Sequence, residues 1–238
     1  MLAEDWLALA MEASTAEERR RLARRGLALR APLDPTTQAM LLRQVYLGSF
    51  ELGQLRRAYT VAEQAIDTGV MPDVMHQDAA RAATALGWGD RAVQHLRLAA
   101  RSSPASRRAF HYWTLGSTLL LLGRAAEAEG ALERATRWGS TDKPLYRAHA
   151  VLARLAAGEV VRDARRVYNR LAEAPCGHGY GRYVLGMLAL HLGELAVARE
   201  HLTSFLQRTR ASRRTMQLAL AGEVRDAERG LARARGLN

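Results

Sequence analysis

The sequence is poor in residues that cross-link a chain or favour strands. Its 238 residues include a single cysteine, Cys176, so no disulfide can form within the chain. Isoleucine occurs once, at Ile66, and prolines number only six, whereas leucine and alanine are abundant. Strand-favouring residues are therefore scarce and helix-favouring residues common. This composition predicts an all-α protein.

Long apolar runs are also missing. No run approaches the roughly 18 consecutive apolar residues that a membrane-spanning helix needs. The first residues include Glu4 and Asp5, where a secretory signal would carry positive charge. We therefore expect a cytoplasmic protein.

Lysine is nearly absent, although the chain is strongly basic. Lys143 is the only lysine among 35 lysines and arginines, which with 24 acidic residues give a net charge of +11. Arginine binds carboxylates and phosphates through paired hydrogen bonds, which suits an acidic protein or a nucleic acid. A genome rich in G and C would produce the same bias without selection for binding. Composition alone leaves both explanations open.

One pattern repeats along the chain with a period near 35 residues. Its glycines lie 34, 36, 35, 35 and 29 residues apart, at Gly53, Gly87, Gly123, Gly158, Gly193 and Gly222. An alanine follows each glycine by five residues, or by six after Gly158, and the stripe continues four and seven residues beyond that alanine. Such spacing places these residues on one helical face. Each unit is predicted to be helix, tight glycine turn, helix, and stacked units bury a continuous core.

The repeats divide the chain, which we predict to be one domain over residues 1–238. Residues 1–33 are expected to form an N-terminal helix pair and residues 34–211 five repeats, with Asp34 as the first N-cap. Residues 212–238 are expected to form a capping helix pair. Gly222 comes early in the period, and terminal repeats of solenoids are usually atypical.

Two local patterns refine these boundaries. Residues 14–17, Ser-Thr-Ala-Glu, read as a capping box at the start of the second helix. Residues 157–164, AGEVVRDA, are nearly copied at 221–227, AGEVRDA. Both copies are predicted to place their glycine in a turn and their last alanine on the helix that follows.

The repeated pattern resembles a known family. The series Tyr112, Leu115, Gly116, Leu119, Gly123, Ala128, Leu132 and Ala135 is similar to the tetratricopeptide repeat (TPR). Gly87, Ala92, Leu96, Ala99 and Pro104 match its second half. The resemblance implies a right-handed α-solenoid of about six to seven helix pairs that serves as a non-enzymatic protein-interaction scaffold. Pairs such as Ala79-Ala80 depart from the family's leucine-glycine pair and are expected to alter local curvature.

The resemblance also implies that the first helix of each pair lines a concave groove. Positions at fixed offsets before each turn glycine form one stripe per helix. We predict a partner-binding groove lined by Met40, Arg43, Leu47, Val74, Gln77, Arg81, Phe110, Trp113, Ser117, Tyr180, Tyr183 and Met187. Its aromatic side chains would anchor an acidic or amphipathic protein segment, and Arg43 and Arg81 would pair with its carboxylates. Alternatively, individual stripe residues only pack between neighbouring helices.

Catalytic and metal-binding patterns are missing from the sequence. The seven histidines form no HExxH motif, and Cys176 with His178 offers too few metal ligands. Neither a GxSxG motif nor a P-loop occurs. We therefore expect no catalytic residue, metal or cofactor. Two other functions remain open: nucleic-acid binding through arginine-rich faces, and a structural subunit that self-associates.

Overall fold

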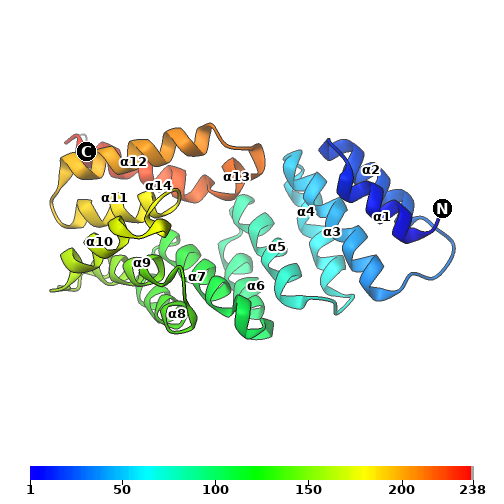
Figure 1. Cartoon of the computed structure of the whole chain (residues 1–238), viewed down its shortest axis with the longest axis horizontal. Coiled ribbons are helices and arrows are strands. Elements are labelled where there is room, and N and C mark those ends of the chain that lie inside the picture. Colours follow the sequence, from blue (N-terminus) through cyan, green and yellow to red (C-terminus); the bar gives the residue numbers. More distant parts are fainter. Residues whose placement is uncertain (237–238) are drawn as a thin grey trace. The chain divides into compact units, whose positions relative to one another are not determined.

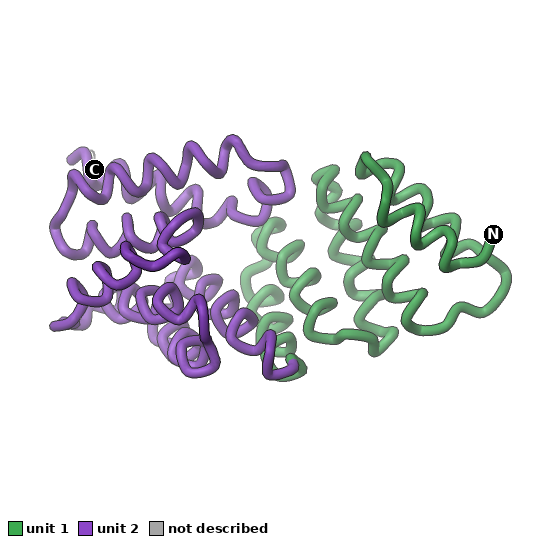
Figure 2. The backbone as a smooth tube through the Cα atoms, viewed as in Figure 1, with its two compact units in different colours: residues 1–103 green, residues 104–238 purple. Residues whose placement is uncertain are grey.

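The computed structural model describes residues 1–236, which form fourteen α-helices and one short 3-10 turn, with no strand among them (Figure 1). The helices form two compact units, residues 1–103 and residues 104–238 (Figure 2). The all-α prediction is confirmed.

Unit 1 contains three helix pairs. Its helices are α1 (Ala3–Glu12), α2 (Ala16–Leu27), α3 (Pro35–Glu51), α4 (Leu55–Ile66), α5 (Pro72–Ala85) and α6 (Gly89–Ser102). Each helix packs on the next one in the chain, and the first helices of successive pairs also pack together, α1 on α3 and α3 on α5. This double contact is typical of stacked helix-turn-helix repeats.

Unit 2 contains four pairs built in the same way. Its elements are α7 (Ala105–Leu121), α8 (Ala125–Trp138), α9 (Lys143–Ala156), α10 (Ala164–Glu173), the 3-10 turn η1 (Pro175–Gly177), α11 (Gly181–His191), α12 (Leu195–Arg210), α13 (Arg214–Ala219) and α14 (Ala221–Ala234). The first helices α7, α9 and α11 pack on one another in order. We call the surface they share the inner face of unit 2.

The predicted glycine turns are confirmed in five of the six repeats. Gly53, Gly87, Gly123, Gly158 and Gly193 have φ between +73° and +86°, a conformation that only glycine adopts without strain. Each ends the first helix of its pair through backbone hydrogen bonds to the last helical turn. The extra valine in the fourth repeat, Val161, is buried in the longer connection between α9 and α10.

Helix starts follow the predicted capping residues, with one shift. The Asp34 carboxylate accepts hydrogen bonds from the backbone N–H of Thr36 and of Thr37, both at 3.0 Å. In the first helix pair, the N-cap of the second helix, α2, is Thr15, whose hydroxyl accepts a hydrogen bond from the backbone N–H of Glu18. The capping residue therefore lies one position later than the sequence pattern predicted, and Glu18 in place of Glu17 occupies the third position of α2.

The prediction of a turn at Gly222 is wrong. Gly222 lies inside α14 with helical backbone, and the helix before it, α13, has only six residues, none of them buried. Within the predicted capping pair of residues 212–238, the described helices are α13 (Arg214–Ala219) and α14 (Ala221–Ala234). Residues 237 and 238 lie outside the described range. The segment copied at 157–164 is thus a turn in one place and a helix in the other.

The positive charge is concentrated in one unit. Residues 1–103 contain 13 lysines and arginines against 12 acidic residues, a net charge of +1. Residues 104–238 contain 22 against 12, a net charge of +10. Any electrostatic attraction of an acidic partner would therefore act mainly on unit 2.

Candidate protein-binding site

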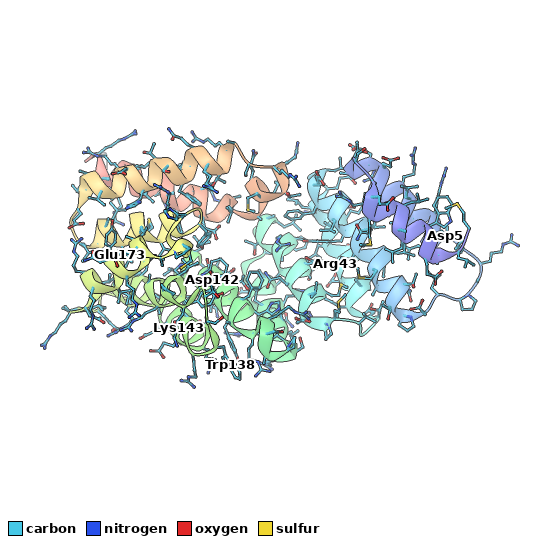
Figure 3. All side chains as sticks on the ribbon, viewed as in Figure 1. Asp5, Arg43, Trp138, Asp142, Lys143 and Glu173 are labelled. Carbon is cyan, nitrogen blue, oxygen red and sulfur yellow. The ribbon has the colours of Figure 1, made fainter. Side chains whose placement is uncertain are left out.

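In unit 1 the two arginines of the predicted groove already share a carboxylate of the chain. Arg43 on α3 contacts Asp78 with Nε 2.9 Å from Oδ2, and Arg81 on α5 contacts the other oxygen at 3.4 Å (Arg43 is labelled in Figure 3). The Asp78 side chain is only 4% exposed. Burial raises the pKa of Asp78 above its ordinary value, while Arg43 and Arg81 act in the opposite direction. The sequence did not predict this internal acid.

The other predicted groove residues of unit 1 lie beside this pair. Met40 and Leu47 on α3, and Val74 and Gln77 on α5, are each half-buried. They contribute both to packing between helices and to the surface. Unit 1 therefore offers a mixed surface whose two cations are partly neutralised by Asp78.

In unit 2 the predicted aromatic residues of α7 differ in exposure. Phe110 is 40% exposed. Trp113 is half-buried, and its indole N–H donates to Nδ1 of His149 on α9 at 3.1 Å. Burial lowers the pKa of His149 to about 3, so this imidazole is neutral and accepts the hydrogen bond. The indole is therefore held in one orientation, beside the Tyr180 ring at 4.9 Å between centroids.

Three predicted groove residues of unit 2, Ser117, Tyr180 and Tyr183, lie at the contact with the chain's own helix α14. The Tyr180 hydroxyl bonds to the Ser117 hydroxyl at 2.9 Å and donates to Oε1 of Glu223 on α14 at 3.2 Å. The Tyr183 hydroxyl donates to Oδ2 of Asp226 on α14 at 2.8 Å. These contacts join α7 and α11 of the inner face to α14.

The apolar contacts of α14 continue along the same face. Gly230 is buried, and a Cβ atom placed there would lie 3.2 Å from the Met187 sulfur and 3.0 Å from Leu190 and Leu202. Figure 1 shows α14 running beside α11 and α12, with which it packs. The inner face of unit 2 is therefore an occupied surface, where the sequence had predicted an open one.

Burial changes the acid–base chemistry at this contact. It raises the pKa of Glu223 to about 7, although hydrogen bonds from Tyr180 and Ser117 lower it. Burial also raises the pKa of Tyr180 well above its usual value, and the Glu223 charge adds to this effect. The tyrosine hydroxyls are therefore donors throughout the physiological range, and the contact favours a protonated Glu223.

The sequence reading missed the residues that face the predicted groove from other elements. Glu223 and Asp226 fell within the predicted capping pair of residues 212–238, and His149 was not among the predicted groove residues. One signal could have found the acids. They are three residues apart on a helix, as Tyr180 and Tyr183 are, and on the same side as the apolar Ala227.

A second candidate surface lies between α9 and α10. A cavity of about 210 Å³ is lined by Pro144, Arg147, Arg166, Val167 and Arg170. Arg147 and Arg166 each contact Asp163 at 3.2 Å, which leaves an excess of positive charge. This surface has the chemistry to bind an anionic group.

Residues 1–236 contain neither a cluster of metal ligands nor a membrane-spanning helix. No group of three or more histidine, cysteine, aspartate or glutamate side chains there could hold a metal ion. No helix in that range is long and apolar enough to cross a membrane.

Comparison with known proteins defines the class of fold. No protein-family model and no curated protein matches the sequence. Thirteen chains of solved structures match the fold. One is YrrB, described as a TPR protein with an unusual peptide-binding site, with a TM-score of 0.50 and 18% identity over 78% of this chain and 91% of that chain. At this identity the likeness shows the fold, a TPR-like α-solenoid, as the sequence resemblance implied.

Proposed function

We propose that the protein is a non-enzymatic protein-interaction scaffold that binds an acidic or amphipathic protein segment. The observation that supports this function is the inner face of unit 2. There Tyr180 and Tyr183 donate hydrogen bonds to two carboxylates of a helix, beside the aromatic side chain of Trp113. A face that combines aromatic anchors with hydroxyl donors suits helix-in-groove recognition.

The charge of unit 2 supports the same partner. A net charge of +10 attracts an acidic segment over the range of a Debye length, about 8–10 Å in physiological salt. Attraction of this kind raises the association rate more than it raises affinity. Part of the affinity would therefore persist at high salt, where only apolar contacts and buried hydrogen bonds remain.

Exposed Phe110 provides a direct test. Phe110→Ala should weaken binding of a fluorescent, glutamate-rich amphipathic helical peptide about 5- to 10-fold, because a truncated aromatic anchor typically costs more than 1 kcal/mol. Fluorescence anisotropy at low and high salt would measure the affinity. The control is Trp138→Ala on α8, which removes an aromatic residue of similar exposure, 46% against 40%. Equal weakening by both variants would argue against a specific role for Phe110.

Nucleic-acid binding is the second candidate, and the arginine-lined cavity between α9 and α10 favours it. A protein that binds mainly phosphates loses affinity steeply as salt rises. Capture from lysate with and without nuclease, at low and high salt, separates the two functions. Retention that is lost with nuclease would support the nucleic-acid alternative and contradict the scaffold proposal.

A further inference from the structure

We propose that α14 is a resident occupant of the inner face of unit 2, and that a partner helix with two carboxylates three residues apart binds there in its place. This inference rests on the proposed function and specifies its ligand. The contacts of α14 then describe what the partner must present.

The spacing of the donors matches the spacing of the acids. Tyr180 and Tyr183 are three residues apart at the start of α11, and Glu223 and Asp226 are three residues apart on α14. The two hydrogen bonds, of 3.2 and 2.8 Å, pair them in order along both helices. Residues three apart project from the same side of a helix, so a single helix can satisfy both tyrosines at once.

The remaining buried side chains of α14 complete the pattern. Ala227, Leu231 and Ala234 are buried, and a Cβ at Gly230 would lie 3.0 Å from Leu190 and Leu202 and 3.2 Å from Met187, closer than ordinary van der Waals contact. The exposed positions are mostly arginines: Arg225, Arg229 and Arg233. A replacing helix therefore needs a carboxylate, a second carboxylate three residues on, a small residue at four and at seven, and an apolar residue at eight.

The attachment of α14 makes it replaceable. The segment that leads to it, α13, has six residues and buries none of them. By contrast, α7, α9 and α11 pack on one another and on their own second helices. Opening of α14 therefore leaves the contacts among α7, α9 and α11 in place, although it exposes the residues that α14 covers on α11 and α12. The weakly packed part of the attachment is α13, and segments with few buried contacts are those that open most readily.

A competing partner must overcome the tether. A helix on a short linker has an effective concentration of about 1 mM. The unchanged chain, in which α14 is docked, therefore binds a competing helix more weakly than a chain in which α14 is undocked. A variant that undocks α14 should therefore raise the affinity for a competing helix, and one that fixes α14 in place should lower it.

The first experiment opens the site from the α14 side. Gly230→Glu should undock α14 while leaving the residues of the inner face unchanged, because even a Cβ there is in tight contact with Leu190, Leu202 and Met187 and the carboxylate would be buried among them. The matched control, Arg225→Glu, places the same side chain on an exposed position of α14. The probe is a fluorescent peptide with the sequence of residues 219–236. We expect the full-length Gly230→Glu chain to bind it at least 10-fold more tightly than the unchanged chain, and the control to bind it like the unchanged chain.

The acids of the probe are tested next. Alanine at both probe positions equivalent to Glu223 and Asp226 should remove at least 10-fold of the affinity for the opened chain. Equal binding of both peptides would overturn the proposed recognition of paired carboxylates.

The second experiment locks the site. Gly222 on α14 lies beside Leu121 on α7, since a Cβ at Gly222 would lie 3.0 Å from Cδ1 and 4.0 Å from Cγ of that leucine. Leu121→Cys with Gly222→Cys, in a Cys176→Ser chain, is treated with oxidised glutathione, and loss of both free thiols in the monomer shows that the disulfide has formed. The oxidised chain should lose probe binding, and reduction should restore it. Covalent dimers on a non-reducing gel would identify a second copy as the occupant and overturn the proposal of a foreign partner.

The outcomes separate this inference from the proposed function. Equal binding of the probe to the unchanged, opened and locked chains would overturn replacement of α14 and leave a scaffold that binds elsewhere. Absence of binding to every form, with α14 shown by amide exchange to be undocked in the Gly230→Glu chain, would overturn this inference. The proposed function is contradicted as well only if the glutamate-rich peptide of the Phe110 test also fails to bind.

Discussion

Leu202→Ala is expected to lower the free energy of unfolding of unit 2 by about 3–5 kcal/mol, the upper range for removal of a buried leucine. Leu202 on α12 is fully buried. A Cβ on Gly186 would lie 2.6 Å from its side chain, and one on Gly230 would lie 3.0 Å away. This single leucine of α12 therefore packs against both α11 and α14, and its removal leaves a cavity between the three helices.

The measurement is urea unfolding followed by circular dichroism, with amide exchange to assign the loss to residues 104–236. The control, Leu195→Ala at the start of α12, removes the same atoms from a residue that is 46% exposed and should cost less than about 1 kcal/mol. A similar loss for both variants would show that Leu202 has no special place in the packing.

Burial also decides which substitution can test the role of Tyr183. Alanine at this position, a natural choice when Tyr183 is taken for an exposed groove residue, would remove a ring that is 1% exposed and destabilise the unit. Tyr183→Phe keeps the ring and removes only the hydroxyl that donates to Asp226. Loss of binding in that variant therefore reports recognition and not unfolding.

Local sequence patterns predicted the stacked pairs because they act over short distances. The turn at Gly123 needs only a glycine with positive φ and a helix on each side. The same local reasoning failed at Gly222. Residues 221–227 can form a turn or a helix, and the neighbours decide. At Gly158 the turn closes the long helix α9, whereas at Gly222 the burial of Glu223 and Ala227 favours a continuous helix.

Helical spacing also explains why only part of the candidate site could be predicted from the sequence. Helical spacing placed Ser117, Tyr180 and Tyr183 on one side of their helices, and the structure brings them together. What covers them comes from 43 residues further along the chain, in the bonds of Tyr180 and Tyr183 to α14. In unit 1, likewise, an intrahelical stripe could not reveal that Asp78 would neutralise Arg43. Tertiary partners of polar residues are not encoded in helical periodicity.

Lowering the pH from 8 to 5 is expected to strengthen the docking of α14 through Glu223 by about 2–3 kcal/mol. Burial raises the pKa of Glu223 from 4.5 to about 7 in the docked helix, and an undocked helix returns it to solvent. A raised carboxyl pKa favours the docked state when the group is protonated. The contribution is therefore complete below pH 4.5 and is lost as the pH rises through 7, at 1.36 kcal/mol for each unit of pKa difference.

A histidine at the other end of the contact acts in the opposite direction. Burial, and then Arg233 on α14, lowers the pKa of His191 below 6.5, so docking favours the neutral imidazole. Its contribution is complete above pH 6.5 and is lost as the pH falls through the lowered value. Between pH 8 and 6.5 Glu223 acts with little opposition, and in that window the population of undocked α14 should fall about 4-fold.

Amide exchange of residues 222–234 measures this population, with Glu223→Gln as the reference chain. The amide of glutamine occupies the site without titrating, so the reference lacks the pH dependence of Glu223 and keeps that of His191. Dividing the exchange rate of the unchanged chain by that of the Glu223→Gln chain at each pH cancels the intrinsic pH dependence of exchange. The ratio should rise between pH 6.5 and 8, and a flat ratio would show that Glu223 does not control the helix. Because the same opening exposes Tyr180 and Tyr183, the ratio also measures how often the inner face is free, whereas a partner that buries a carboxyl group at the same position would show the same pH dependence as α14 itself.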